Sequence, residues 1–290
     1  MNLYAFKAPH GNFGDDLNGW LWPRVFGSDM VRSPHTTFIG IGSILDSRLE
    51  RLNGPKVVFG SGIRSTRNPP SRTDSLRIRF VRGPISASVI GHGTAAITDP
   101  AILVGPLVDG TAASGGRAIG FMPHYHSLKA IDWERLCGDA GFVFIDPRES
   151  VERTIAALRG CERIVTEAMH GAIVADALRI PWHRVSVLAW RTEGFDVASL
   201  KWLDWGLSAG VDVTPTHLGL DFLQSSGRLL RAANRAVRPI ARRRLRESML
   251  KLRTGASYQL SSDSTRSQLL ARIGDQVEDM REWLRKSQDG

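Results

Sequence analysis

Residues 142–178, FVFIDPRESVERTIAALRGCERIVTEAMHGAIVADAL, decide the fold class of this chain. An apolar run ends at Asp146-Pro147, and the next segment begins with the acidic residues Glu149 and Glu152, which the helix dipole favours in a first turn. A second apolar run and a second helix-like segment follow. The pattern predicts strand, helix, strand and helix, with the first helix at residues 149–159, which is typical of a parallel sheet covered by helices.

The same alternation continues on both sides of this stretch. Toward the N-terminus, apolar runs ending in glycine turns read NLYAFKA, TTFIGIGSIL, KVVFGSGI and RIRFVRG, and the small-residue stretch 111–116 has linker composition. The sequence therefore predicts an α/β fold of two Rossmann-like domains, residues 1–114 and 115–212, with a ligand cleft between them. Residues 213–290 are expected to form a basic helical tail, interrupted at Pro239.

Composition indicates a folded protein without a membrane span. Hydrophobic residues make up 42% and charged residues 23% of the 290 positions, and no stretch reaches the roughly 18 apolar residues of a span. The N-terminus lacks the pattern of a leader peptide, so a cytoplasmic location is expected. Cys137 and Cys161 have neither CxxC spacing nor clustered histidines, so we expect reduced, inert thiols and no metal site.

The net charge of +9 is concentrated in one segment. Residues 225–254 hold ten basic residues and one acid, Glu247, and so account for the whole excess. A basic amphipathic segment is drawn to anionic lipid, which predicts binding to the inner face of the cytoplasmic membrane. The alternatives are a solvated helix packed on the protein or a partner-binding arm. A nucleic-acid-binding protein is disfavoured, because this charge lies outside the α/β units that carry the motifs.

Candidate site residues follow the first predicted strand in the segment 11–18, GNFGDDLN. Gly11, Asn12 and Gly14 allow the backbone to approach a ligand, and amides at the start of the next helix can hold an anion. The alternative is a tight turn in which Asp15 or Asp16 caps a helix.

Two arginines and a glycine follow later strands of the first half. Gly62 and Arg64 come after KVVFGS, and Arg82 comes after RIRFV. Small residues at strand ends would leave a crevice, into which each guanidinium could point at a phosphate or carboxylate. Taken singly, each arginine could equally be a surface residue.

In the second half, two histidines occupy comparable places. His124 follows the strand GFMP, and His170 lies between a strand and a helix with a glycine behind it, where an imidazole can face a cleft. A structural role is the alternative for each histidine.

Taken together, the motifs resemble the polysaccharide pyruvyltransferases, most closely the succinoglycan ketalase type. GNFGDDLN, GIGSIL, VFGSGI, FVRGPIS, DPAILV, GFMPHY and EAMHGAIVADAL occur in the order of that family, over roughly residues 3–190. The resemblance implies a two-domain glycosyltransferase-B-like fold. The family's histidine usually follows an arginine in a Ser-Asp-Arg-x-His-Gly motif, whereas Glu167-Ala168-Met169 precedes His170 here.

The resemblance also implies an activity. The family moves the enolpyruvyl unit of phosphoenolpyruvate onto a sugar as a pyruvate ketal, with the acceptor oligosaccharide on a polyprenyl diphosphate. Phosphoenolpyruvate is a co-substrate, and no cofactor or metal is required. His170 is then expected to be the acid, with Asp15 or Asp16 acting on the acceptor hydroxyls. The residues expected to bind phosphoenolpyruvate are Arg82, Arg64, His124, Gly11, Asn12, Gly14 and Gly62.

Two other functions fit the same sequence. A nucleotide-sugar glycosyltransferase would use the same kind of cleft, because fold alone does not fix function. An inactive subunit of polysaccharide assembly would keep the fold with altered residues before His170.

Overall fold

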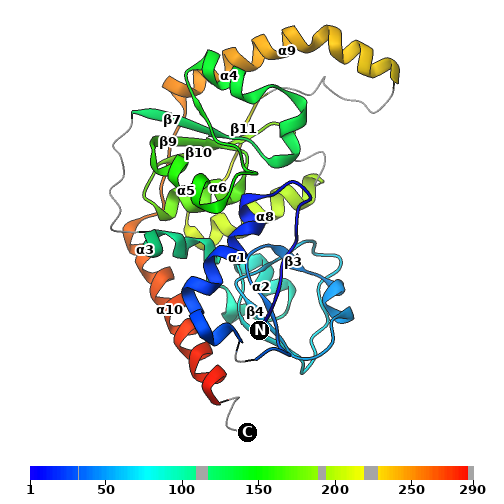
Figure 1. Ribbon diagram of the computed structural model, residues 1–290, viewed down its shortest axis with the longest axis vertical. Helices are drawn as coiled ribbons and strands as arrows, with labels where there is room; N and C mark the ends of the chain where they lie inside the picture. The colour runs from blue at the N-terminus through cyan, green and yellow to red at the C-terminus, as the bar shows by residue number, and fades with distance from the viewer. Residues whose placement is uncertain (32, 109–116, 189–193, 219–227, 287–290) are drawn as a thin grey trace.

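The computed structural model describes residues 1–31, 33–108, 117–188, 194–218 and 228–286. Among these residues, the strands form two larger parallel sheets and one short two-stranded sheet (Figure 1). The first sheet has the order β1-β2-β4-β6, the second has the order β11-β10-β9-β7-β8, and β3 pairs with β5. The predicted α/β class with parallel sheets is confirmed.

The strands are β1 (Asn2–Tyr4), β2 (Thr37–Ile39), β3 (Ser43–Leu45), β4 (Lys56–Phe59), β5 (Gly62–Ile63), β6 (Leu76–Phe80), β7 (Ala118–Met122), β8 (Val143–Phe144), β9 (Cys161–Thr166), β10 (Trp182–Ser186) and β11 (Thr216–His217). The α-helices are α1 (Phe13–Phe26), α2 (Pro84–Val89), α3 (Val104–Val108), α4 (Trp133–Ala140), α5 (Val151–Arg159), α6 (Met169–Ala177), α8 (Phe195–Ala209), α9 (Arg228–Gly255) and α10 (Asp263–Lys286). Short 3₁₀ turns include η2 (Ser47–Arg51), η4 (Pro100–Leu103) and η5 (Tyr125–Ala130).

Residues 142–178 fold as expected, except that the first helix begins later than predicted. The predicted helix over residues 149–159 is α5, which begins at Val151 because the Ser150 hydroxyl accepts a hydrogen bond from the amide of Arg153 at 3.3 Å. The following strand β9 lies between β7 and β10, and α6 returns along the sheet. The carboxyl ends of β7 and β9 therefore meet at one edge of the second sheet.

One apolar core connects the two larger sheets. Trp22 packs edge-on against Phe38 and Phe59 of the first sheet, and the same core includes Ile164 and Trp182 of the second. Helices α1 and α6 lie against one another inside this core. Apolar side chains thus fill much of the space between the sheets, and what stays open lies at the carboxyl ends of the strands.

The basic helix α9 continues through Pro239, so the predicted interruption there is wrong. Its second half packs on α4 through the buried side chains of Leu245, Met249 and Leu252. A proline removes one backbone donor, and tertiary packing of the following turns offsets that loss.

The last helix, α10, crosses back to the first half of the chain (Figure 1). It begins inside the Ser/Thr-rich stretch, because the Ser262 hydroxyl accepts a hydrogen bond from the amide of Thr265 at 3.0 Å. Its buried face, including Ile273, Met280 and Leu284, joins the core shared by the two sheets. The described residues after position 212 therefore contribute to the body of the protein. The boundary at 114/115 lies outside the described residues, and both proposed boundaries stay predictions.

Two further expectations concern the cysteines and the membrane. Cys137 and Cys161 are free and buried, and burial raises the pKa of Cys137 to about 12 and that of Cys161 to about 11. The thiolate is the reactive form, so both thiols are inert at neutral pH. None of the described helices combines the length and the apolar composition that a bilayer span requires.

A buried ion pair attaches α8 to the first half. Arg82 donates through Nε to Oδ2 of Asp204 at 3.2 Å, and both side chains are 0% exposed. The Asp204 carboxylate also accepts hydrogen bonds from the amide and the hydroxyl of Ser86, at 2.9 and 2.6 Å. The pair thereby joins α8, α2 and the end of β6.

We predict that Asp204→Ala lowers the free energy of unfolding by about 3–5 kcal/mol, because it leaves the buried Arg82 charge without its partner. Urea denaturation followed by circular dichroism measures this change. The matched control is Asp275→Ala on the exposed face of α10, which should change stability by less than about 0.5 kcal/mol. Equal stability of the two variants would contradict the assigned role of the pair.

Candidate active site

A cleft of about 590 Å³ opens where strand ends of the two halves face one another. The first half lines it with Asn12, Gly14, Asp15, Ser43, Arg48 and Arg64. The second half lines it with His124, Tyr125, His126, His170 and Lys201. The tertiary structure thus brings together most of the residues singled out in the sequence, around one cavity.

The first turn of α1 separates the two neighbouring aspartates. Asp16 is exposed and accepts a hydrogen bond from the amide of Asn12 at 2.9 Å, so it caps the helix. Asp15 lines the cleft and accepts a hydrogen bond from the side-chain amide of Asn12 at 2.5 Å. The structure therefore places Asp15, and not Asp16, where it can reach a bound substrate.

The environment of Asp15 makes its carboxylate more basic than an ordinary aspartate. Burial raises its pKa, and the Asn12 hydrogen bond and the charges of His170 and Lys201 act in the opposite direction. A carboxyl group tuned this way is better suited to take a proton from a hydroxyl than an ordinary aspartate.

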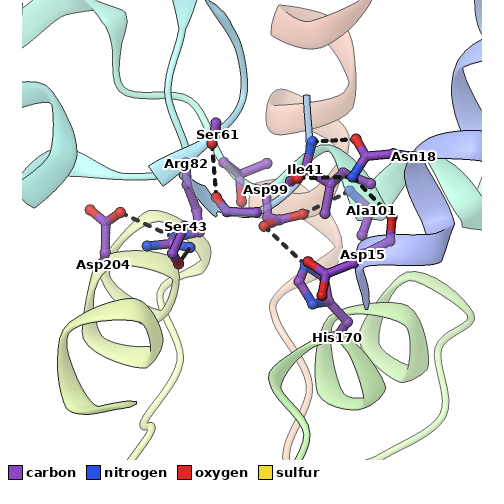
Figure 2. A network of polar contacts seen from close by, with 12 residues as sticks. Asp15, Asn18, Ile41, Ser43, Ser61, Arg82, Asp99, Ala101, His170 and Asp204 are labelled. Atoms are coloured by element: carbon purple, nitrogen blue, oxygen red, sulfur yellow. Dashed lines mark hydrogen bonds and ion pairs between the residues drawn. The ribbon is translucent and has the colours of Figure 1, made fainter. Parts of the chain in front are cut away.

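His170 enters the cleft from the first turn of α6 and packs directly on Gly14 of α1. A Cβ atom at position 14 would lie 2.0 Å from Nδ1 of His170, so only glycine permits this contact. On the other side of the ring, Nε2 lies 3.5 Å from Oδ2 of Asp99, as Figure 2 shows. The imidazole is held between the two halves, with 14% of its side chain exposed.

Ser43 at the start of β3, Arg48 in η2 and Arg64 directly after β5 also line the cleft. Arg48 is paired with Asp46, with 2.6 Å between Nη2 and Oδ2. This hydrogen-bonded partner raises the pKa of Arg48. Arg64 is exposed at the rim, where its guanidinium is available to an anionic ligand.

Arg82 is predicted to bind phosphoenolpyruvate, but it does not line the cleft. Its guanidinium is fully buried, pairs with Asp204 and donates through Nη1 to Oγ of Ser43 at 2.8 Å. Arg82 therefore lies beneath the wall of the cleft and fixes Ser43, which lines it (Figure 2).

Two predicted glycines also lie outside the lining of the cleft. A Cβ atom at Gly62 would be 2.3 Å from Cζ of Arg82, and one at Gly11 would be 2.9 Å from the carbonyl oxygen of Arg148. Gly11 has a φ of 84°, which glycine adopts without strain. Both glycines let protein segments approach each other, and neither contacts the cavity.

His124 lines the cleft from the second half, and the buried Glu167 supports its backbone. Glu167 is buried and accepts hydrogen bonds from the amide of His124 at 3.0 Å, of Val187 at 2.9 Å and of Leu188 at 2.8 Å. It thus holds the segments that follow β7 and β10. Glu167, the first residue of the segment Glu167-Ala168-Met169 before His170, thus has a structural role and positions the backbone of His124.

Sequence reasoning missed Lys201, Arg48, Tyr125 and His126. Lys201 reaches the cleft from α8, a helix far along the chain whose sequence shows no site motif. Tyr125 and His126 directly follow His124 and could have been included with it, since all three rings lie within 5.2 Å of one another. Arg48 follows the GIGSIL motif by a few residues.

Among the described residues, no group of three or more histidine, cysteine or acidic side chains is arranged to hold a metal ion. The cleft instead combines cations, imidazoles and one carboxylate of raised pKa. Such a set can bind an anionic substrate and move protons.

Comparison with known proteins shows the family of this chain. Residues 25–187 match the family model described as polysaccharide pyruvyl transferase. The succinoglycan biosynthesis protein ExoV of Rhizobium meliloti (strain 1021) is 36% identical over 220 residues, which cover 75% of this chain and 68% of that protein. This chain belongs to the polysaccharide pyruvyl transferase family. No solved structure matches it.

As a polysaccharide pyruvyl transferase the protein is a transferase enzyme, and the family match contains part of its site. His124 and His170 lie within the matched residues, whereas the first turn of α1 with Asp15 precedes them. The α1 contribution to the cleft is therefore evident from the structure and from the motif, and not from the family match.

We predict that Asp15→Asn stabilises the protein more at pH 7 than at about pH 4. A raised folded-state pKa means that the folded protein binds this proton more tightly than the unfolded chain, so stability is lost as the pH rises through that pKa. Asparagine carries no charge at this position, so the variant avoids the loss of stability that the wild type shows as the pH rises. Urea midpoints of variant and wild type across this pH range measure the difference.

Asp16→Asn is the matched control, because it changes the same charge on the exposed side of the same turn. It weakens a cap and should lower stability slightly at pH 7. A difference for Asp15→Asn that does not depend on pH would contradict the burial of its charge.

Proposed function

We propose that this enzyme transfers the enolpyruvyl unit of phosphoenolpyruvate to two hydroxyls of one sugar, forming a pyruvate ketal during exopolysaccharide biosynthesis. The observation that carries the proposal is one cleft in which His170, Asp15 and the cations of both halves converge, in a member of the polysaccharide pyruvyl transferase family. The similarity to ExoV supports the exopolysaccharide context.

The donor brings a phosphate and a carboxylate, which need cationic partners. Arg64 from the first half and Lys201 from α8 line the cleft on its two sides, with His124 between strand ends of the second half. The first turn of α1 adds the backbone amide of Gly14, at the positive end of a helix. We assign the phosphate and the carboxylate to these groups.

His170 is the proposed acid. It gives a proton to the methylene carbon of phosphoenolpyruvate, and the electron pair of the double bond forms the new C–H bond, which leaves an oxocarbenium centre at C2. A sugar hydroxyl attacks C2 and gives up its proton. A positioned acid or base contributes about 10²–10⁴-fold to such steps.

Asp15 is the proposed base toward the acceptor. The C–O bond to phosphate then breaks, phosphate leaves with its electron pair, and a second hydroxyl of the same sugar attacks C2 and loses its proton. The sum is phosphoenolpyruvate plus a sugar diol giving a ketal plus phosphate. Asp15 lines the cleft from the first turn of α1, near the imidazole of His170.

We also infer a glycosyltransferase-B-like arrangement of two Rossmann-like domains. Two parallel sheets, a cleft at the carboxyl ends of their strands, and α10 returning to the first half support it. The shared apolar core limits how far the halves could open, because opening would expose it.

The first test incubates the protein with phosphoenolpyruvate and a lipid-linked oligosaccharide that lacks pyruvate. We predict phosphate release and a glycan mass gain of one pyruvic acid less water, both lowered at least about 10²-fold in His170→Gln. His35→Gln, which changes an exposed histidine outside the cleft, is the matched control and should keep full activity. Hexose transfer from a nucleotide sugar without pyruvyl transfer would assign the cleft to glycosyl transfer instead.

We propose that the acceptor is carried on polyprenyl diphosphate and that residues 225–254 hold the enzyme at the anionic inner face of the cytoplasmic membrane. Residues 225–227 lie outside the described part of the chain. In the described part of α9, Arg243 and Arg244 are exposed, and Ile240 is 55% exposed, while the buried face packs on α4. The outward side of α9 is thus basic with an apolar residue, which suits a membrane surface.

We predict that the full-length chain floats with vesicles containing anionic lipid and that neutralising four α9 arginines releases it, because each contributes about 1 kcal/mol near the surface. The variant carries glutamine at four exposed arginines in the described part of α9: Arg243, Arg244, Arg246 and Arg253. The matched control carries glutamine at four exposed arginines elsewhere: Arg51, Arg67, Arg72 and Arg135. Equal flotation of both variants would exclude α9 as the anchor.

A further inference from the structure

The motif DPAILV places a buried carboxylate directly behind His170. Asp99 is 0% exposed, and its Oδ1 accepts a hydrogen bond from the amide of Ala101 at 3.0 Å, which caps the 3₁₀ turn η4. Its other oxygen, Oδ2, is buried and has no hydrogen-bond partner among the described residues. Capping η4 therefore explains why Oδ1 is buried, but it gives no reason for the burial of Oδ2.

The second oxygen faces an equally unusual atom. Nε2 of His170 is also buried without a hydrogen-bond partner among the described residues, and it lies 3.5 Å from Oδ2 of Asp99 (Figure 2). Buried polar atoms are costly unless they are paired. The two atoms can satisfy each other if the Nε2 proton points to the carboxylate, which needs only a small movement to reach hydrogen-bond distance.

The opposite side of the imidazole faces the cleft. Nδ1 of His170 lies against Gly14 on one side, but unlike Nε2 it is not among the buried polar atoms that lack a partner, and His170 lines the cleft. The ring is thus oriented with Nε2 inward and Nδ1 toward the substrate space. The missing side chain at position 14 leaves room for the imidazole itself.

We propose that Asp99 is a positioning residue that keeps a proton on Nε2 of His170, so that Nδ1 is the nitrogen that exchanges protons with the substrate. The catalytic half of this inference rests on the proposed pyruvyl transfer. In each transfer the Nδ1–H bond breaks as the new C–H bond forms on the methylene carbon, and the imidazole is left neutral with its remaining proton on Nε2. Nδ1 is later reprotonated, with a proton released by the acceptor hydroxyls as one source.

Asp99→Asn tests this assignment without removing the cap. Oδ1 of asparagine can still accept from the amide of Ala101, which turns the side-chain NH₂ toward His170. Nε2 must then accept, and the proton of the neutral ring moves to Nδ1. The variant has the size of the wild type and reverses the hydrogen-bond polarity at one atom.

The primary readout is the ¹⁵N spectrum of the histidine rings of the full chain at a pH where the imidazole is neutral. The His170→Gln spectrum identifies the His170 signals. We expect the Nε2–H tautomer in the wild type and the Nδ1–H tautomer in Asp99→Asn. In the pyruvyl-transfer assay, kcat should fall about 10²–10⁴-fold with the KM for phosphoenolpyruvate changed only a few-fold.

Asp176→Asn is the matched control. Asp176 is 4% exposed and accepts hydrogen bonds from Trp182 and from the amide of Ser261, outside the lining of the cleft. This variant should lose stability and keep both the His170 tautomer and a near-normal kcat. It thereby separates a general loss of buried polar contacts from an effect on the imidazole.

An Nδ1–H tautomer in the wild type, or an unchanged tautomer and kcat in Asp99→Asn, overturns the inference. Pyruvyl transfer by the wild type together with full activity of Asp99→Asn overturns it while leaving the proposed function intact. The expected tautomer change in a protein that does not transfer pyruvyl units supports the positioning by Asp99 and overturns only the proposed reaction.

Discussion

The contact between Gly14 and His170 is the constraint on which the rest of the site depends. Helices α1 and α6 start at strand ends of different sheets, and they can bring their first turns together only because position 14 has no side chain. This contact puts Asp15, on the same turn of α1, next to the imidazole. The shared core beneath it, built from both sheets and α10, fixes the distance between them. Close packing of this kind leaves little freedom to Asp15 and His170, as the proposed proton transfers require.

Buried charges play two different parts around the cleft. Arg82 and Asp204 neutralise each other below the wall and hold Ser43 and Ser86 in place, so their charges are not available to a ligand. Asp99 instead faces His170 with an otherwise unpartnered oxygen. The charges that can meet a substrate are those on the lining, and they come from both sides of the cavity. A substrate that carries two anionic groups could therefore bind to cations of both halves at once.

The C-terminal segment combines two roles that its composition does not separate. Helix α9 packs one face on α4 and presents arginines on the other, whereas α10 completes the core between the sheets. Removing the whole segment would expose that core. A charge-neutralising substitution in α9 is therefore the appropriate way to examine its surface, since it leaves the packing of α10 unchanged.

The sequence by itself determined the α/β class, the helix after Asp146-Pro147 and the motifs that line the cleft, because strand and helix periodicity and glycine turns are local properties. It also predicted His170, His124, Asp15 and Arg64 as site residues, and the structure places all four on the cavity. It could not distinguish Asp15 from Asp16, place Lys201, or show that Arg82 is buried against Asp204. Those outcomes depend on which surfaces meet across more than a hundred residues of chain, and only tertiary packing decides that.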